Sequence, residues 1–279
     1  MNRQVLAYCD PVEGGPNLAD TSFRLVASYD SLRLSCYRDK GSRGHLISIA
    51  SIGSATLLRF EDVGYFNRVY ANGDVTDRLE SIERFFRGSP HGCKLVTPVL
   101  CDTDALATAC ASRGWLPDEK YAWLAGTDLA PRSSGSDAFE IRPPRADEQE
   151  LFLNSYLAGF GNDPERRSMA VENMRHLFSV QNLYFLFALR AGRPGGIGMM
   201  YVSGPSALLC AGATLPSHEG RGCHKALLTA RIRLAHDLGC TRIFSWAVAG
   251  GRSQANMESL GLRTVSTTRA WRLPPGLAR

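Results

Sequence analysis

The stretch LLCAGATLPSHEGRGCHKALLTARIRLAHDL, residues 208–238, has the pattern of a strand, a glycine loop and a helix. Residues 208–215 are apolar and short enough for a buried strand, which the Pro-Ser pair at 216–217 ends. After Gly220 and Gly222, apolar residues recur every three or four positions, so we expect an amphipathic helix that ends before Gly239. The apolar positions are Cys223, Leu227, Ala230, Leu234 and Leu238.

A strand that leads through glycines into a helix makes a candidate anion site. The first N–H groups of a helix have no partner inside it, and the helix dipole adds partial positive charge there. Glycines let the backbone approach phosphate oxygens closely. Arg221 and Lys225 add full positive charges on the same turn. The glycine spacing alone is equally compatible with an ordinary strand–helix connection.

The string PSHEGRGCHKALL, residues 216–228, resembles the coenzyme A pyrophosphate loop of the GCN5-related N-acetyltransferase (GNAT) family. That pattern is Arg or Gln, two residues, Gly, one residue, then Gly or Ala before an apolar helix. Gly222 matches the middle glycine, with Arg221 before it. Two positions depart: Glu219 replaces Arg or Gln, and His224 replaces Gly or Ala. The glutamate weakens diphosphate binding unless it turns away, and the histidine either crowds the loop or donates to a phosphate oxygen.

The resemblance implies acetyl-CoA as cosubstrate, no metal, and a second cofactor segment at GGRSQANMESLGL, residues 250–262. There Asn256 would contact the pantetheine arm, unless it is a solvated helix residue, and Ser253 would help, besides acting as an N-cap. The N–H of Ala213 or Leu215 is the candidate donor to the reaction's oxyanion. The cofactor-binding residues expected on this basis are Ala213, Thr214, Leu215, Gly220, Arg221, Gly222, Cys223, His224, Lys225, Ser253 and Asn256.

Length and composition indicate a globular chain of two domains. The 279 residues are many for one domain, and 44% hydrophobic with 21% charged residues is far from disorder. No apolar run is long enough for a transmembrane helix, and the first residues lack a signal peptide's apolar core, so we expect a cytoplasmic protein. The eight cysteines show neither a C-x-x-C pair nor zinc spacing, which favours buried reduced thiols. The net charge of +5 without a basic block argues against nucleic acid.

The order of elements matches the GNAT fold, and patterns in the N-terminal half indicate a degenerate repeat of the same plan. SRGW and AWL at 112–115 and 122–124 parallel SLGL and AWRL at 259–262 and 270–273. Asp74 stands where the first copy's loop would need a basic residue, and a carboxylate there fills the anion site from within. We therefore expect an α/β (α+β mixed) fold of two GNAT-like domains, each a mostly antiparallel mixed sheet flanked by helices. The domains would be 1–132, without cofactor, and 133–279, catalytic, joined by a linker at 130–138.

Local patterns predict the individual elements. Asp163 and Pro164 would begin the helix that starts at 164. Strands are expected at 23–27, 32–36, 45–52, 55–60, 65–70, 94–100, 121–125, 139–142, 183–189, 197–202, 208–215, 242–248 and 267–273. Helices are expected at 75–86, 103–112, 146–159, 164–178, 223–238 and 253–260.

Membership of this family would make the chain an N-acetyltransferase that acts by direct attack of an amine in a ternary complex. The acceptor would be a small-molecule or peptide amine, with no nucleic acid or membrane partner, and a homodimer is compatible with this. The family's usual acid, a tyrosine after the last helix, is missing; Ser266 falls nearest that position. His218 is a candidate base because the intrinsic pKa of histidine lies near neutrality, although a solvated loop histidine is the simpler interpretation. Outside candidates are Glu172, His176, Tyr184 and Tyr201. A non-catalytic GNAT-like module that binds coenzyme A or acts by interaction remains the alternative.

Overall fold

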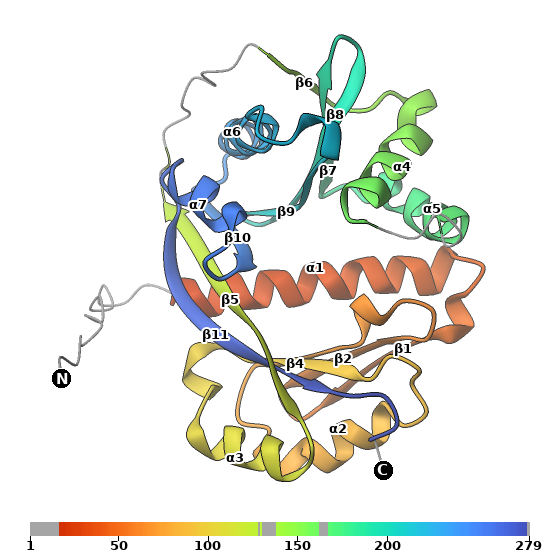
Figure 1. Ribbon diagram of the computed structural model, residues 1–279, viewed down its shortest axis with the longest axis vertical. Coiled ribbons are helices and arrows are strands. Elements are labelled where there is room, and N and C mark those ends of the chain that lie inside the picture. Colours follow the sequence, from red (N-terminus) through yellow and green to blue (C-terminus); the bar gives the residue numbers. More distant parts are fainter. Residues whose placement is uncertain (1–16, 128, 130–137, 162–166, 278–279) are drawn as a thin grey trace, which may run out of the picture.

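The structure, a computed structural model, describes residues 17–127, 129, 138–161 and 167–277. The expected linker at 130–138 falls almost wholly outside these residues, as do the domain boundary at 132 and the helix start at Asp163 and Pro164. One continuous sheet of eleven strands runs through the described chain, in the order β1-β2-β3-β4-β11-β5-β10-β9-β8-β7-β6. Helices cover both of its faces (Figure 1).

The elements fall into an N-terminal half, residues 17–127, and a C-terminal half, residues 138–277. The first holds α1 (Leu18–Lys40), β1 (Ile47–Ile52), β2 (Ala55–Phe60), β3 (Arg68–Ala71), α2 (Leu79–Phe85), β4 (Cys93–Val96), α3 (Asp104–Ser112) and β5 (Leu116–Thr127). The second holds β6 (Glu140–Arg142), α4 (Gln149–Gly159), α5 (Arg167–Arg175), β7 (Leu183–Arg190), β8 (Arg193–Ser203), β9 (Ser206–Thr214), α6 (Cys223–Asp237), β10 (Arg242–Val248), α7 (Arg252–Glu258) and β11 (Arg263–Leu273).

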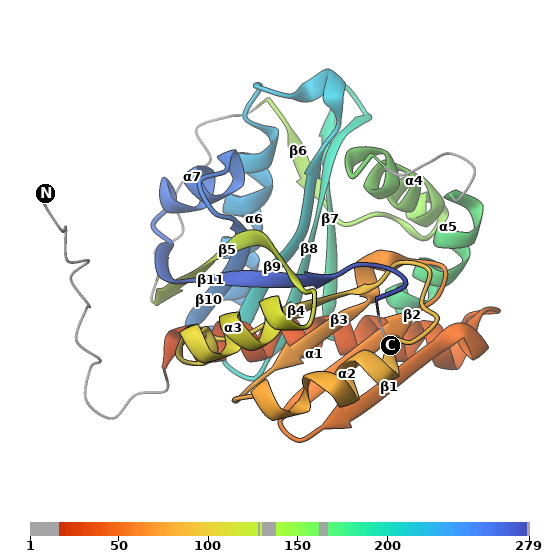
Figure 2. The same cartoon turned by 60° about the horizontal axis from the view of Figure 1, so that its bottom comes forward.

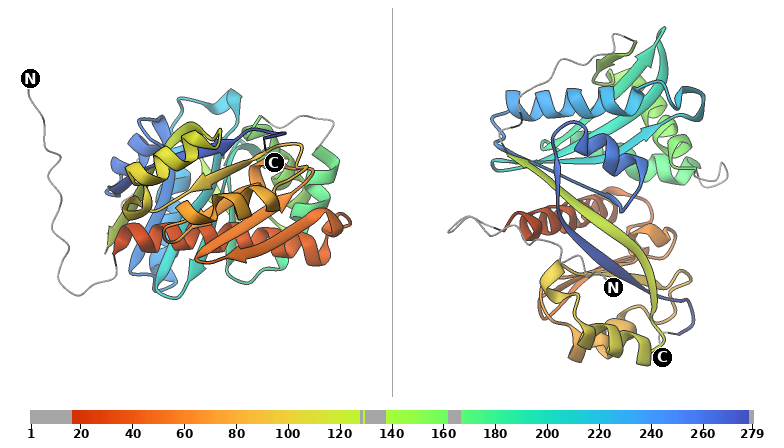
Figure 3. Two further views of the ribbon diagram at one scale, coloured as in Figure 1. Left: turned by 90° about the horizontal axis from the view of Figure 1, so that it is seen from below. Right: turned by 60° about the vertical axis from the view of Figure 1, so that its left-hand side comes forward.

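The two halves exchange strands through β5 and β11. The last strand, β11, pairs with β4 of the N-terminal half on one side and with β5 on the other. Strand β5 in turn pairs with β10 of the C-terminal half. The two long strands run side by side from one half to the other (Figure 3). The sheets of the two halves are therefore joined into one continuous sheet.

Helix α1 occupies the segment where the sequence patterns predicted two strands, at 23–27 and 32–36, so both strand predictions are wrong. Asn17 caps the helix by accepting the N–H of Ala19 at 3.0 Å. Its buried positions recur every three or four residues along the whole helix. Two of these buried positions, Asp30 and Arg33, are charged. In a short window of the sequence they divide the apolar residues of the helix into separate runs that resemble strands. Only a longer window would have shown the period.

The charges inside that stripe form a buried network. Arg33 Nη2 lies 3.2 Å from Asp30 Oδ1, and the hydroxyl of Tyr70 on β3 donates to Asp30 Oδ2 at 2.5 Å. Asp30 and Arg33 are 0% and 2% exposed. The network ties α1 to β3 of the N-terminal half. Elsewhere α1 lies between the two halves (Figure 1): Phe23 packs on Trp123 of β5, and Tyr29 packs on Trp246 of β10.

This pair gives the first prediction. Arg33→Met leaves the Asp30 carboxylate buried without its cation, so the free energy of unfolding should fall by about 3–5 kcal/mol. The matched control is Arg38→Met on the same helix, whose exposed pair with Asp39 should contribute no more than about 1 kcal/mol. Denaturant unfolding of both variants measures the difference. Equal losses would show that the buried pair has no special role.

Each half contains one pair of parallel strands, and the two pairs differ. In the N-terminal half, β3 and β4 stay paired over nearly the whole of β3, from Arg68 to Tyr70. After β3, the Asp74 carboxylate accepts the Thr76 hydroxyl at 2.6 Å and the Thr76 N–H at 2.9 Å, and these two hydrogen bonds, the first above all, lower the pKa of Asp74. Asp74 thus lies in the turn before the 3-10 helix Thr76–Arg78, where the sequence placed it, and its filling of an anion site stays a prediction. In the C-terminal half, β9 and β10 pair only at their starts, from Arg242↔Ser206 to Phe244↔Leu208, and then separate.

Most of the other predicted elements are present with shifted ends. The β7–β8 turn lies at Ala191 and Gly192, because β8 already begins at Arg193. Strand β4 ends at Val96, and a short 3-10 helix follows at Val99–Cys101. Seven cysteines lie in the described chain as free thiols, all buried except the half-buried Cys101.

Candidate functional site

Where β9 and β10 separate there is a cavity of about 680 Å³, which extends from one face of the sheet to the other. Helix α6 covers one face of the C-terminal strands, and α1 with α4 covers the other (Figure 2). The opening itself is lined by residues 209–212 of β9 and by Ser245 and Trp246 of β10. His224 and Arg231 of α6 line the first side, and α1, α4 and α5 line the second. A ligand can therefore reach the strand edge from both faces.

Strand β9 has a bulge at this opening. Its register against β8 shifts between Ile197 and Met199, and Ala211 has a φ of 45°, which is rare for a residue with a side chain. The bulge breaks the ladder opposite the place where β10 leaves β9. Strained backbone of this kind persists where surrounding contacts hold it, and it is concentrated at functional sites.

Arg231 of α6 is the contact that holds the bulge. Its Nη1 donates to the carbonyl oxygens of Cys210 at 2.9 Å and Met199 at 3.0 Å, and its Nε donates to Leu227 at 3.1 Å. The residue is 1% exposed, no ion pair of its side chain is found in the described chain, and burial lowers its pKa to about 10. Gly198 and Gly212 make room: a Cβ on either would lie within 3.0 Å of the guanidinium.

These bonds fix the direction of one peptide group. The Cys210 carbonyl points at Arg231, and in a trans peptide the N–H of the next residue points the opposite way. The N–H of Ala211 is therefore turned away from α6. The N–H of Leu215, by contrast, donates to Gly195 O at 2.9 Å, so this expected oxyanion donor is already used. Ala213, two residues earlier, faces the same way in the strand. Both N–H groups thus face β8 instead of the opening.

The start of α6 is an uncapped helix N-terminus. Gly222 is the N-cap with φ 81°, no side chain caps it, and Ala226 N–H is the first to bond back to Gly222 O. Arg221 and Lys225 are exposed beside it. The Glu219 carboxylate lies 3.8 Å from Arg252 Nη1, so its charge is partly offset. This helix start lies where the glycine loop predicted an anion site, and that role stays a prediction.

His224 points inward from the first turn of α6. Asn256 Nδ2 donates to His224 Nδ1 at 3.0 Å, which places the imidazole proton on Nε2. Burial, with the nearby Arg231 charge as the second cause, lowers the His224 pKa to about 4. The ring is therefore neutral at physiological pH and adds no positive charge for a phosphate. Cys223 also turns inward, and burial raises its thiol pKa to about 11.

The remaining predicted site residues are divided between the cavity and other places. Ser253 belongs to α7 and lines the cavity. The N-cap of α7 is Gly251, so the predicted capping role of Ser253 is wrong. His218 packs against the Phe139 ring, at the outer end of the sheet, and does not line the cavity. Ser266 pairs with Trp123, which pairs with Trp246, so the whole of β5 separates it from the opening.

The outside candidates also lie apart from the opening. Glu172 and His176 are not among the lining residues; Asn173 and Met174 of the same helix are. Tyr201 hydrogen-bonds Ser28 at 3.0 Å, and Tyr184 packs on the α6 side. None of these four side chains lines the cavity formed by the described residues.

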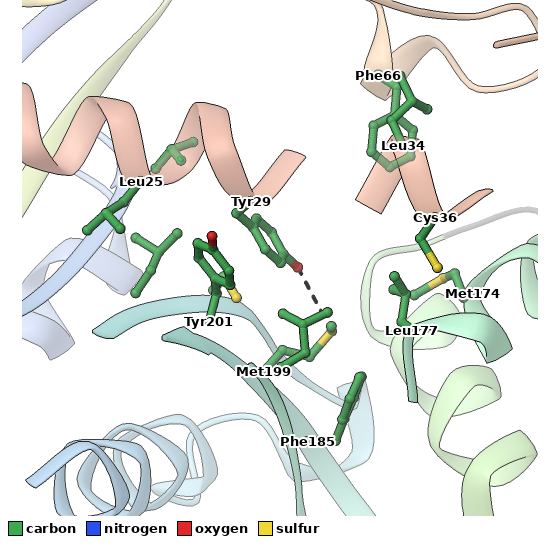
Figure 4. Packing of buried hydrophobic residues seen from close by; sticks show 14 of the residues in the cluster. Leu25, Tyr29, Leu34, Cys36, Phe66, Met174, Leu177, Phe185, Met199 and Tyr201 are labelled. Atoms are coloured by element: carbon green, nitrogen blue, oxygen red, sulfur yellow. Dashed lines mark hydrogen bonds between the residues drawn. The ribbon is translucent and has the colours of Figure 1, made fainter. Parts of the chain in front are cut away.

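Sequence reasoning missed Tyr29, Arg33 and the other lining residues of α1, because that helix was predicted as two strands. Figure 4 shows Tyr29 directed from α1 towards strand β8, with its hydroxyl 4.0 Å from the sulfur of Met199. Its ring lies 6.4 Å from that of Trp246 at the opening. Arg231 had a signal in the sequence: it is an arginine inside the apolar stripe of the α6 helix.

Comparison with solved structures places this arrangement among known folds. An N-acetyltransferase of the GNAT type from Kribbella flavida superposes with a TM-score of 0.62, at 16% identity, over 91% of this chain and 96% of that one. The chain has the GNAT fold. A tandem GNAT protein from the clavulanic acid biosynthesis pathway matches with a TM-score of 0.57, at 10% identity, over 89% and 97% of the two chains. A putative GNAT acetyltransferase from Novosphingobium aromaticivorans matches at 0.54, with 16% identity and 82% and 90% coverage.

At these identities the likeness concerns the fold. No family model matches the sequence, and no curated protein matches it either. Among the described helices, none combines the length and apolar character that crossing a membrane requires. The described residues also contain no group of three or more His, Cys, Asp or Glu side chains that could hold a metal ion.

Proposed function

We propose that the chain is an N-acetyltransferase that moves an acetyl group from acetyl-CoA to an amine. The observation that carries the proposal is the opening between β9 and β10. It is lined by the strained edge of β9 and by His224, in the first turn of α6, beside an uncapped helix start with two exposed basic residues. The diphosphate would lie at Gly222, Arg221 and Lys225. The pantetheine arm, an amide-containing chain, would lie along the unpaired edge of β9, where Ser253 also contacts the cavity.

The chain's residues supply the electrostatics of the transfer. The amine forms a C–N bond to the thioester carbon, the C–S bond breaks, and the proton lost by nitrogen balances the one gained by sulfur. The N–H of Ala211 would donate to the oxyanion, because Arg231 holds the Cys210 carbonyl on the opposite side. Arg231 thus acts as a positioning residue, and its hydrogen bond also polarises that peptide group.

The cavity favours the neutral amine without a dedicated base. Among the described lining residues, Asp62 is the one carboxylate, and Arg43 Nε lies 3.1 Å from it. Burial and the positive charge of Arg231 both lower the pKa of an ammonium group bound near the bulge. The amine can then lose its proton to water before it attacks.

Acetyl-CoA would bind the C-terminal half alone. Strands β3 and β4 stay paired, so the N-terminal half has no corresponding opening among its described residues, and Asp74 occupies its helix-start turn. The alternative is a non-catalytic module that binds coenzyme A.

Transfer itself tests the proposal. The chain is incubated with acetyl-CoA and a panel of primary amines, and products are detected by mass spectrometry. An amine that gains one acetyl group, with equimolar release of free coenzyme A thiol, supports it. Binding of coenzyme A without any acetylated product favours the non-catalytic alternative.

A further inference from the structure

The cavity has a second wall, on the face of the sheet opposite α6, and both halves of the chain build it. We call it the acceptor wall: the lining residues of α1, of the segment 60–66, of α4 and of α5. The N-terminal half supplies Tyr29, Arg33 and Tyr37 from α1 and Tyr65 and Phe66 from the segment after β2. The half without a cofactor opening therefore forms part of the site of the other half.

The charges on the acceptor wall are already paired. Arg33 is bound to Asp30, its Nη1 donates to the Tyr29 hydroxyl at 3.2 Å, and its guanidinium lies 4.7 Å from the Phe66 ring centre. The Asp62 carboxylate lies 3.1 Å from Arg43. In the described part of the chain, this wall thus offers no free carboxylate to a cation.

The acceptor wall instead exposes aromatic rings to the cavity. Tyr65 and Phe160 are 45% and 49% exposed, although both are large apolar rings. Phe160 packs one side on Tyr156, with ring centres 4.8 Å apart, and its accessible remainder borders the cavity.

The same rings continue into an adjoining hollow of about 530 Å³. Tyr65, Phe160 and Trp246 line both hollows. Arg68 lines the second one, 4.4 Å from the Tyr65 ring centre, and no ion pair of Arg68 is found in the described chain. Lys94 and Glu119 also line this hollow and pair with each other at 3.0 Å. A neutral ring bound there would contact three aromatic side chains.

We propose that the acceptor is a small monoamine carrying an aromatic ring, which Tyr65 and Phe160 bind while its amine reaches the bulge at Ala211. This rests on the proposed acetyl transfer and adds the acceptor class to it. The physical basis is burial of an aromatic ring against aromatic faces, at a wall whose own charges are neutralised.

The test compares amines and wall variants, with acetyl-CoA as donor. For the intact chain, kcat/KM for 2-phenylethylamine should exceed those for butylamine and spermidine at least tenfold. Phe160→Ala should raise the KM for 2-phenylethylamine about tenfold and that for butylamine less than threefold. Leu151→Ala is the matched control, because Leu151 lies on α4, is 45% exposed and does not line the cavity. It should change neither KM.

Two outcomes would overturn the inference and leave acetyl transfer standing. One is faster acetylation of spermidine or kanamycin than of 2-phenylethylamine. The other is an equal change of both KM values in Phe160→Ala. If no amine of any class is acetylated, the proposed function itself fails, and this inference fails with it.

Discussion

Replacing Arg231 by methionine is expected to lower kcat about 10²–10³-fold, while the Kd for coenzyme A changes less than threefold. The expected size is that for loss of one oxyanion-hole donor. Methionine fills the space but leaves the Cys210 and Met199 carbonyls without their donor, so the bulge can relax and the Ala211 N–H loses its direction. Steady-state kinetics and titration calorimetry together separate turnover from binding.

Two further variants show whether the effect belongs to the bulge. Arg231→Lys keeps a charge but cannot bond three carbonyls in one plane, so it should recover only part of kcat. Arg190→Met removes an exposed arginine at the end of β7 and should leave kcat unchanged. If Arg231→Met lowers kcat and coenzyme A affinity in parallel with a large drop in melting temperature, Arg231 serves stability alone.

Replacing Gly222 by valine is expected to abolish most coenzyme A binding, at least a hundredfold in Kd. Gly222 has φ 81°, a conformation that a β-branched residue adopts only with strain, and it is the N-cap that opens α6. The valine therefore either shifts the loop or blocks the diphosphate from the first N–H groups of α6. Both effects raise the Kd.

Gly239 gives the control for strain alone. It follows the same helix and has φ 77°, and a Cβ added there, as at Gly222, would have no other atom within 4 Å. Gly239→Val should lower the melting temperature by a similar amount and leave the Kd unchanged. Equal losses of affinity in the two variants would contradict the placement of the diphosphate at Gly222.

The sequence could predict the strand, the loop and the helix of the proposed cofactor site, because these elements are adjacent in the chain. Strand, loop and helix are contiguous from Ser206 to Asp237, and the glycine spacing reports the positive φ of Gly220 and Gly222. The degenerate turn at Asp74 could be predicted for the same reason.

The acceptor side could not be predicted, because it depends on tertiary contacts. The buried Asp30 and Arg33 concealed the helical period of α1. Because α1 was predicted as strands, the position of Tyr29 on the acceptor wall could not be predicted. The insertion of β5 between β10 and β11 moved Ser266 away from the opening, and no local pattern reports a strand exchange. The proposed oxyanion donor is Ala211 instead of Ala213 or Leu215, because Arg231, which lies 21 residues after Cys210 in the chain, sets the bulge.

The central claim is that one acetyl-CoA binds each chain, in the opening between β9 and β10. Isothermal titration of the full chain with acetyl-CoA tests it most directly, because stoichiometry does not depend on the identity of the acceptor. We expect one site per chain, which Gly222→Val loses and Gly239→Val keeps. Two sites per chain, no measurable binding, or full binding retained in Gly222→Val would contradict the account.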